Sequence, residues 1–84
     1  MSCELCNLVT GERDSLVYYE DEKILILDCK TCRIPMGVWK EHKPKLSIEE
    51  REYLVRQMIF VLGQPNDFRE PYKNVEHYHL HFVP

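Results

Sequence analysis

The sequence lacks a long hydrophobic run, an excess of basic residues and a recognisable secretory leader. Its longest apolar runs are residues 24–27 and 58–62, far below the roughly 20 residues that span a membrane. Eleven basic residues stand against 14 acidic ones, giving a net charge of −3, which argues against non-specific nucleic-acid binding through a basic face. The first ten residues contain neither the basic nor the apolar segment of a signal peptide. We therefore expect a soluble cytoplasmic protein without a membrane partner.

The chain is also short, with 84 residues. This length excludes a second packed domain and a doubly wound dinucleotide-binding fold. Hydrophobic residues make up 44% and charged residues 30% of the chain, a composition typical of globular proteins. A core this small gains the most stability from an additional cross-link such as a metal ion. We expect one domain over residues 1–84.

Four cysteines form two pairs, Cys3 with Cys6 and Cys29 with Cys32. The two-residue gap within each pair lets both thiolates reach one tetrahedral ion. Because a chain without a secretory leader stays reduced, structural zinc is favoured over a disulfide framework. The spacing alone permits a four-cysteine zinc ribbon, and free thiols are the alternative without a metal.

Three of the four histidines lie in the closing run HYHLHFVP, residues 77–84. Its period of two predicts a strand with His77, His79 and His81 on one face. Three imidazoles in register indicate a functional or metal-binding role, because clustered cations repel and other polar residues would serve solvation equally well. Use of all three as ligands of one catalytic metal is disfavoured, since adjacent positions on one strand face lie about 7 Å apart.

Residues 15–20 and 23–28 are rich in β-branched and aromatic side chains and predict a β-hairpin. The run 24–27 has no polar alternation, so we expect it to be covered on both faces. Residues 33–39 predict a third strand. Core packing is the favoured interpretation of four aromatic residues, with a subunit interface as the alternative: Tyr18, Tyr19, Trp39 and Phe60.

A helix is predicted over residues 48–62, with Ser47 and Glu50 forming a capping box and Gly63 at the C-cap. Residues 64–73 predict a loop, with no strand between the helix and the histidine run. The expected fold is α+β: an antiparallel sheet of about four strands with one main helix and an N-terminal zinc knuckle.

Four segments together resemble the zinc-type HIT (histidine triad) family, of which this chain would be an unusually short member. The opening CELCNLVTGE, residues 3–12, is similar to the family's CxxC, two aliphatics and Gly-Glu. The predicted hairpin ends in an acidic residue, and residues 38–42 (VWKEH) end in a histidine, as in relatives. The closing run fits the pattern His-φ-His-φ-His-φ-φ at every position.

The resemblance implies a structural zinc ion. By position in the family pattern, its ligands would be two thiolates and two imidazoles, from Cys3, Cys6, His42 and His77. The ion would position the site rather than activate water.

The resemblance also implies a nucleotide phosphohydrolase or nucleotidyl transferase that acts on nucleoside phosphoramidates or dinucleoside polyphosphates. His79 would attack the α-phosphorus to give a covalent nucleotidyl-histidine, and His81 would contact the phosphate. Asp28 would lie near the ribose, and Asn74 would donate a hydrogen bond to phosphate. Relatives commonly form homodimers, which would add burial to a small core.

One segment departs from the family pattern. Relatives carry a glycine-rich phosphate loop that ends in Gly-Gln-Ser or Gly-Gln-Thr, whereas residues 72–76 here are YKNVE. The glycines that let a backbone close on phosphate are missing. A HIT-like nucleotide-binding module with little or no turnover is therefore the alternative function.

Overall fold

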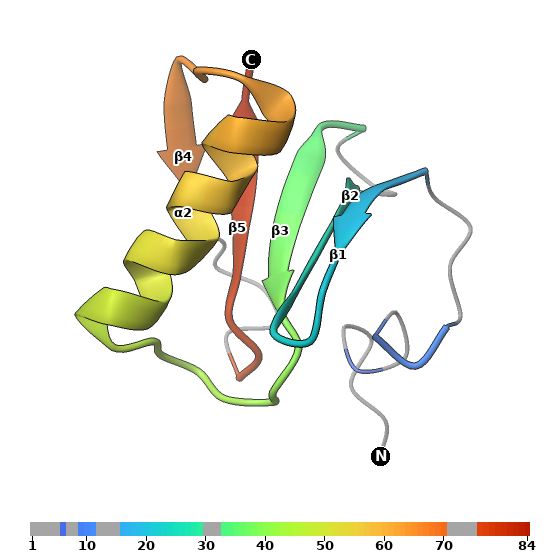
Figure 1. Cartoon of the computed structure of the whole chain (residues 1–84), viewed down its shortest axis with the longest axis vertical. Coiled ribbons are helices and arrows are strands. Elements are labelled where there is room, and N and C mark those ends of the chain that lie inside the picture. The colour runs from blue at the N-terminus through green and yellow to red at the C-terminus, as the bar shows by residue number, and fades with distance from the viewer. Residues whose placement is uncertain (1–5, 7–8, 12–15, 30–32, 71–75) are drawn as a thin grey trace.

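The protein folds into a five-stranded antiparallel sheet with one helix against one of its faces (Figure 1). The computed structural model describes residues 6, 9–11, 16–29, 33–70 and 76–84. Its elements are β1 (Val17–Glu20), β2 (Ile24–Asp28), β3 (Pro35–Trp39), α2 (Ile48–Leu62), β4 (Asp67–Arg69) and β5 (His79–Val83). The strand order is β1-β2-β3-β5-β4, so the C-terminal strand lies between β3 and β4. The predicted α+β class is confirmed.

Strand β4 corrects the prediction of a loop over residues 64–73, and it brings the sheet to five strands where about four were expected. The three residues of β4 pair with β5, and the ring of Phe68 packs edge-on against Phe82 at a centroid distance of 6.1 Å. Three residues are too short to show a period of two in the sequence. This strand forms because β5 offers it a pairing edge and an aromatic contact.

Strand β2 is covered on both faces, as its unbroken apolar run predicts. Residues 24–27 are all fully buried. Ile24 and Ile26 belong to the core cluster on the helix side, whereas Leu25 and Leu27 belong to a second cluster on the opposite side. The strand therefore separates two apolar layers at the centre of the fold.

Helix α2 has the predicted bounds and the predicted caps. The Ser47 side chain accepts a hydrogen bond from the Glu50 backbone at 3.1 Å, and the Glu50 carboxylate accepts one from the Ser47 backbone at 2.9 Å. The helix ends at Gly63, whose φ of 92° favours glycine. Within the described ranges, no helix is long and apolar enough to cross a membrane.

Gly37 in the middle of β3 brings the helix close to the sheet. A Cβ atom at this position would lie 2.5 Å from Sδ of Met58 and 3.0 Å from a methyl carbon of Leu54. Both of these side chains extend from α2 and are fully buried. The absence of a side chain at residue 37 therefore fixes how near the helix packs against β3.

Core packing was expected for four aromatic residues, and for two of them this expectation was wrong. Trp39 is 6% exposed and belongs to the core, and Tyr19 packs against the same cluster. Phe60, by contrast, is 84% exposed and Tyr18 is 39% exposed. Phe60 follows the buried Met58 by two residues, which turns it about 200° around the helix and away from the sheet.

Strand β5 turns its two kinds of side chain to opposite faces. Leu80 and Phe82 lie in the core cluster beneath α2. Alternation sends His79 and His81 to the other face, where their cross-strand partners in β3 are Val38 and Met36. The fold therefore places these two histidines beside each other on the face that α2 does not cover.

Candidate functional site

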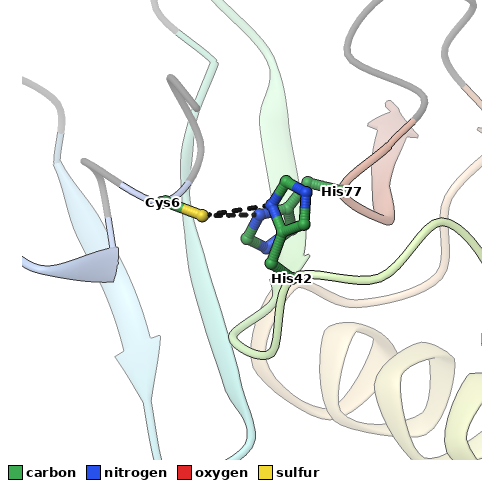
Figure 2. A group of neighbouring side chains, drawn as sticks. All are labelled: Cys6, His42 and His77. Carbon is green, nitrogen blue, oxygen red and sulfur yellow. Dashed lines mark hydrogen bonds between the residues drawn. The ribbon is translucent and has the colours of Figure 1, made fainter. Parts of the chain in front are cut away.

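Three side chains from distant parts of the chain converge at the start of β5. The Cys6 Sγ atom lies 3.2 Å from Nδ1 of His42 and 3.4 Å from Nδ1 of His77. Figure 2 shows the sulfur atom directed at both imidazole rings. The three potential ligand atoms all lie within 4.8 Å of one another, so they can reach one ion.

The backbone of β3 orients the His77 ring within this cluster. His77 is fully buried, and its Nε2–H donates a hydrogen bond to the carbonyl oxygen of Trp39 at 2.5 Å. This hydrogen bond leaves the lone pair of the neutral ring on Nδ1, the atom that faces Cys6. His42 comes from the bend after β3, and its ring meets the His77 ring edge-on at 5.1 Å.

The distances within the donor set are compatible with a shared metal ion. Zinc–sulfur and zinc–nitrogen bonds of ordinary length place the sulfur and nitrogen ligands about 3.5 Å apart, close to the two distances from Cys6. Burial lowers the pKa of His77, the hydrogen bond to Trp39 opposes that shift, and His42 and His79 lower the pKa further. A neutral imidazole is the form that binds a metal.

The other cysteines lie outside this group or outside the described residues. Cys3, the fourth ligand that the family pattern implies, is not among the described residues. Cys29 is half-buried against the second apolar cluster, and the cluster of potential metal ligands in the described part of the chain does not include it. Its sequence partner Cys32 also lies outside the described residues.

The second feature of the site is the pair His79 and His81. Both are buried, at 4% and 9% exposure, and their rings meet at 5.6 Å with an interplanar angle of 69°. Nδ1–H of His79 donates to the backbone carbonyl of His77 at 2.9 Å. In the neutral ring this places the lone pair on Nε2.

The expected face of three imidazoles is only partly correct. Strand β5 begins at His79, and His77 lies in the turn that precedes it. The Trp39 carbonyl and the Cys6 sulfur hold this turn in place. His77 therefore belongs to the cysteine–histidine cluster, while His79 and His81 continue along the strand.

A cation near His81 was missed at the sequence level. Arg69 is the direct cross-strand partner of His81. Burial lowers the pKa of His81, and the charges of His79 and Arg69 lower it further. No signal in the sequence pointed to this arginine, because β4 itself was not predicted.

The hydrogen bonds found between described residues do not connect the two expected substrate contacts, Asp28 and Asn74, with His79 or His81. Asp28 ends β2 opposite Pro35, on the helix side by alternation, and its Oδ1 accepts a hydrogen bond of 2.7 Å from the Tyr18 hydroxyl. This hydrogen bond to Asp28 is the main cause that raises the pKa of Tyr18. Asn74 lies outside the described residues.

Comparison with known proteins identifies the fold but assigns no family by sequence. No protein-family model matches the chain, and no curated protein matches it. Several solved structures do. A HIT family protein from Bacillus anthracis is 22% identical, with a TM-score of 0.68 over 99% of this chain and 72% of its own.

Two other matches give the same result. A histidine triad protein from Clostridium difficile is 21% identical, with a TM-score of 0.69 over 99% of this chain and 90% of its own. A histidine triad nucleotide-binding protein from Candida albicans is 18% identical, with a TM-score of 0.67 over 96% of this chain and 73% of its own. The chain thus has a HIT-like fold.

Proposed function

We propose that this protein is a HIT-like nucleotide phosphohydrolase or nucleotidyl transferase that acts at the α-phosphorus of a nucleotide conjugate. The observation that carries the proposal is the oriented His79 ring, whose Nδ1–H is held by the His77 carbonyl at 2.9 Å. The names of similar structures support it: one is a HIT family hydrolase from Legionella pneumophila, and another is a histidine triad nucleotide-binding protein.

In the first proposed step, Nε2 of His79 attacks the α-phosphorus. A nitrogen–phosphorus bond forms, the bond to the leaving group breaks, and the leaving group departs with a proton from solvent. The product is a covalent nucleotidyl-histidine. His81, on the same face, donates a hydrogen bond to a phosphoryl oxygen and so stabilises the charge that develops there.

In the second proposed step, a water molecule attacks the same phosphorus. The nitrogen–phosphorus bond breaks, the nucleotide leaves with the water oxygen, the proton that the water loses passes to solvent, and His79 returns to its neutral starting form. Transfer to an acceptor other than water follows the same course. The hydrogen bond from His79 to the His77 carbonyl stabilises the positive ring in both steps.

The cysteine–histidine group holds the proposed nucleophile in position. Zinc would be held by Cys3, Cys6, His42 and His77, and it would supply structural cross-linking alone. By fixing His77, this group also fixes the carbonyl oxygen that orients His79. Every protein atom that reacts in the proposed steps therefore belongs to the histidine strand.

The remaining contacts are proposed from the family pattern. Asp28 would bind the ribose with the oxygen that Tyr18 leaves available, and Asn74 would donate to a phosphate oxygen. A nucleotide or nucleotide conjugate is the proposed partner, and a homodimer is the proposed assembly. The exposed Phe60 on α2 is a surface that a second copy would cover.

The test compares the wild type with His79→Ala, using adenosine phosphoramidate and dinucleoside polyphosphates as substrates. Gln64→Ala, at an exposed position beyond α2, serves as the control. We expect His79→Ala to lose at least about a hundredfold in kcat/KM, while Gln64→Ala keeps the wild-type rate. Equal rates for the wild type and His79→Ala would overturn the catalytic proposal.

The alternative is a nucleotide-binding module without turnover. It is favoured by the sequence YKNVE at residues 72–76, where a glycine-rich loop would be expected. If AMP binds to the wild type while neither substrate is consumed, this alternative replaces the enzyme.

A further inference from the structure

Strand β4 places a positive charge beside the two histidines. The register pairs Asp67 with Val83, Phe68 with Phe82 and Arg69 with His81. Directly paired residues point to the same face of a sheet. The edge-on contact of Phe68 with Phe82 lies on the helix side, so Arg69 and His81 share the opposite face.

Arg69 has the reach to contact a group bound at His79. His79 is its diagonal neighbour, and such pairs lie about 7–8 Å apart, within range of a long side chain. Arg69 is exposed, and the ion pairs formed between described residues do not involve it. The neighbouring Glu70, which alternation turns the other way, lies 3.8 Å from Arg51 on α2.

The side chain of Arg69 suits an incoming anion. Asp67 shares its face two residues away and keeps its negative charge; its Oδ1 accepts a hydrogen bond of 2.8 Å from the Phe68 backbone, and the ion pairs between described residues do not join it to Arg69. The guanidinium group presents several donors in a planar fork that matches phosphate oxygens. In this chain, residues 72–76 lack the glycines that would let a backbone wrap a phosphate.

We infer that Arg69 is a phosphate-binding residue of the His79–His81 face, and that its guanidinium group supplies hydrogen-bond donors of the kind that a glycine-rich loop would supply from its backbone N–H groups. This inference rests on the proposed function and names a substrate contact within it. The competing explanation is that Arg69 only protects the exposed edge of β4 from pairing with another chain. The two explanations differ in what happens to phosphate binding.

Calorimetric titrations with AMP and with adenosine separate them. The variants are Arg69→Ala and Arg69→Lys, with Arg56→Ala on the exposed surface of α2 as the control for a lost positive charge. We expect Arg69→Ala to bind AMP about tenfold more weakly while its affinity for adenosine is unchanged. Arg69→Lys should recover part of the loss, because lysine keeps the charge but not the fork.

The outcomes of these titrations separate a failure of the inference from a failure of the proposed function. If Arg69→Ala binds AMP as tightly as Arg56→Ala does, the inference is overturned. The proposed function then still stands, provided that the wild type and His79→Ala differ in turnover. If the wild type neither binds AMP nor consumes a nucleotide substrate, both proposals are overturned. An equal loss of affinity for AMP and adenosine in both Arg69 variants would assign Arg69 a structural role and also overturn the inference.

Discussion

The carbonyl oxygen of Trp39, the last residue of β3, accepts a hydrogen bond of 2.5 Å from Nε2–H of His77. This contact joins the end of β3 to the turn that precedes β5. It sets which nitrogen of His77 faces Cys6, and the His77 carbonyl in turn orients His79. The arrangement of the proposed site therefore depends on the pairing of β3 with β5.

The first prediction concerns the metal. Wild-type protein should bind one zinc ion per chain, and both Cys6→Ser and His77→Ala should lose it, because each removes a ligand of a closed site. Cys3→Ser should lose it as well, whereas Cys29→Ser should retain it. Metal analysis of the purified variants gives the stoichiometry. A loss of zinc from Cys29→Ser as complete as that from Cys6→Ser would instead support the four-cysteine ribbon.

The second prediction concerns Gly37. Gly37→Ala should lower the free energy of unfolding by about 1–3 kcal/mol, because the new methyl group overpacks the contact with Met58. Urea denaturation measures the change. Met58→Ala provides the matched test: it leaves a cavity by itself, but in the double variant it makes room for the methyl group added at residue 37, so the two effects should be less than additive. Simple additivity would show that the close approach is not the cause.

The third prediction concerns acid stability. Burial raises the pKa of Asp21, but hydrogen bonds from Tyr53, the backbone of Ile24 and Lys23, and Tyr19 outweigh it, and the folded pKa is lowered. A lowered folded pKa means that this stabilisation is complete above the unfolded pKa of about 3.9 and is lost as pH falls through the folded pKa.

Asp21→Asn should therefore cost about 1 kcal/mol at pH 7, and this cost should shrink as the pH falls below about 4. Urea denaturation at several pH values measures it. Glu52→Gln, on the exposed surface of α2, should leave stability nearly unchanged across the range. A cost for Asp21→Asn that does not vary with pH would contradict the role of the Asp21 charge.

The fourth prediction concerns the start of α2. Ser47→Ala removes the acceptor for the Glu50 backbone N–H and should lower the free energy of unfolding by about 1 kcal/mol. Ser47→Asp keeps an acceptor and places negative charge at the helix N-terminus, so it should retain wild-type stability. Thermal melts followed by circular dichroism distinguish the two variants. Equal losses for both would show that the capping box contributes little.

Local signals in the sequence were sufficient to predict the elements whose structure depends mainly on residues close together in the chain. The helix was predicted to the residue because its capping box, apolar spacing and C-cap glycine all lie within it or directly beside it. The buried strand β2 was predicted because an unbroken run of four apolar residues is typical of a strand that is covered on both faces. These features need no knowledge of which strand lies beside which.

Features that depend on pairing between distant segments could not be predicted in the same way. Strand β4 exists because β5 pairs with it, and Arg69 gained its place beside His81 only through that register. Phe60 is of a residue type that is common in protein cores, yet its position on α2 directs its side chain away from the sheet. The meeting of Cys6 with two histidines was expected from family resemblance, since spacing alone also permitted a four-cysteine site.

The most direct test of the central claim is intact-mass spectrometry of the protein during turnover of adenosine phosphoramidate, quenched in alkali to preserve a phosphorus–nitrogen bond. We predict a mass increase of one adenylyl group on the wild type, located at His79 by peptide mapping and absent from His79→Ala. Turnover by the wild type with the adduct on another residue, or the same adduct on His79→Ala, would contradict it.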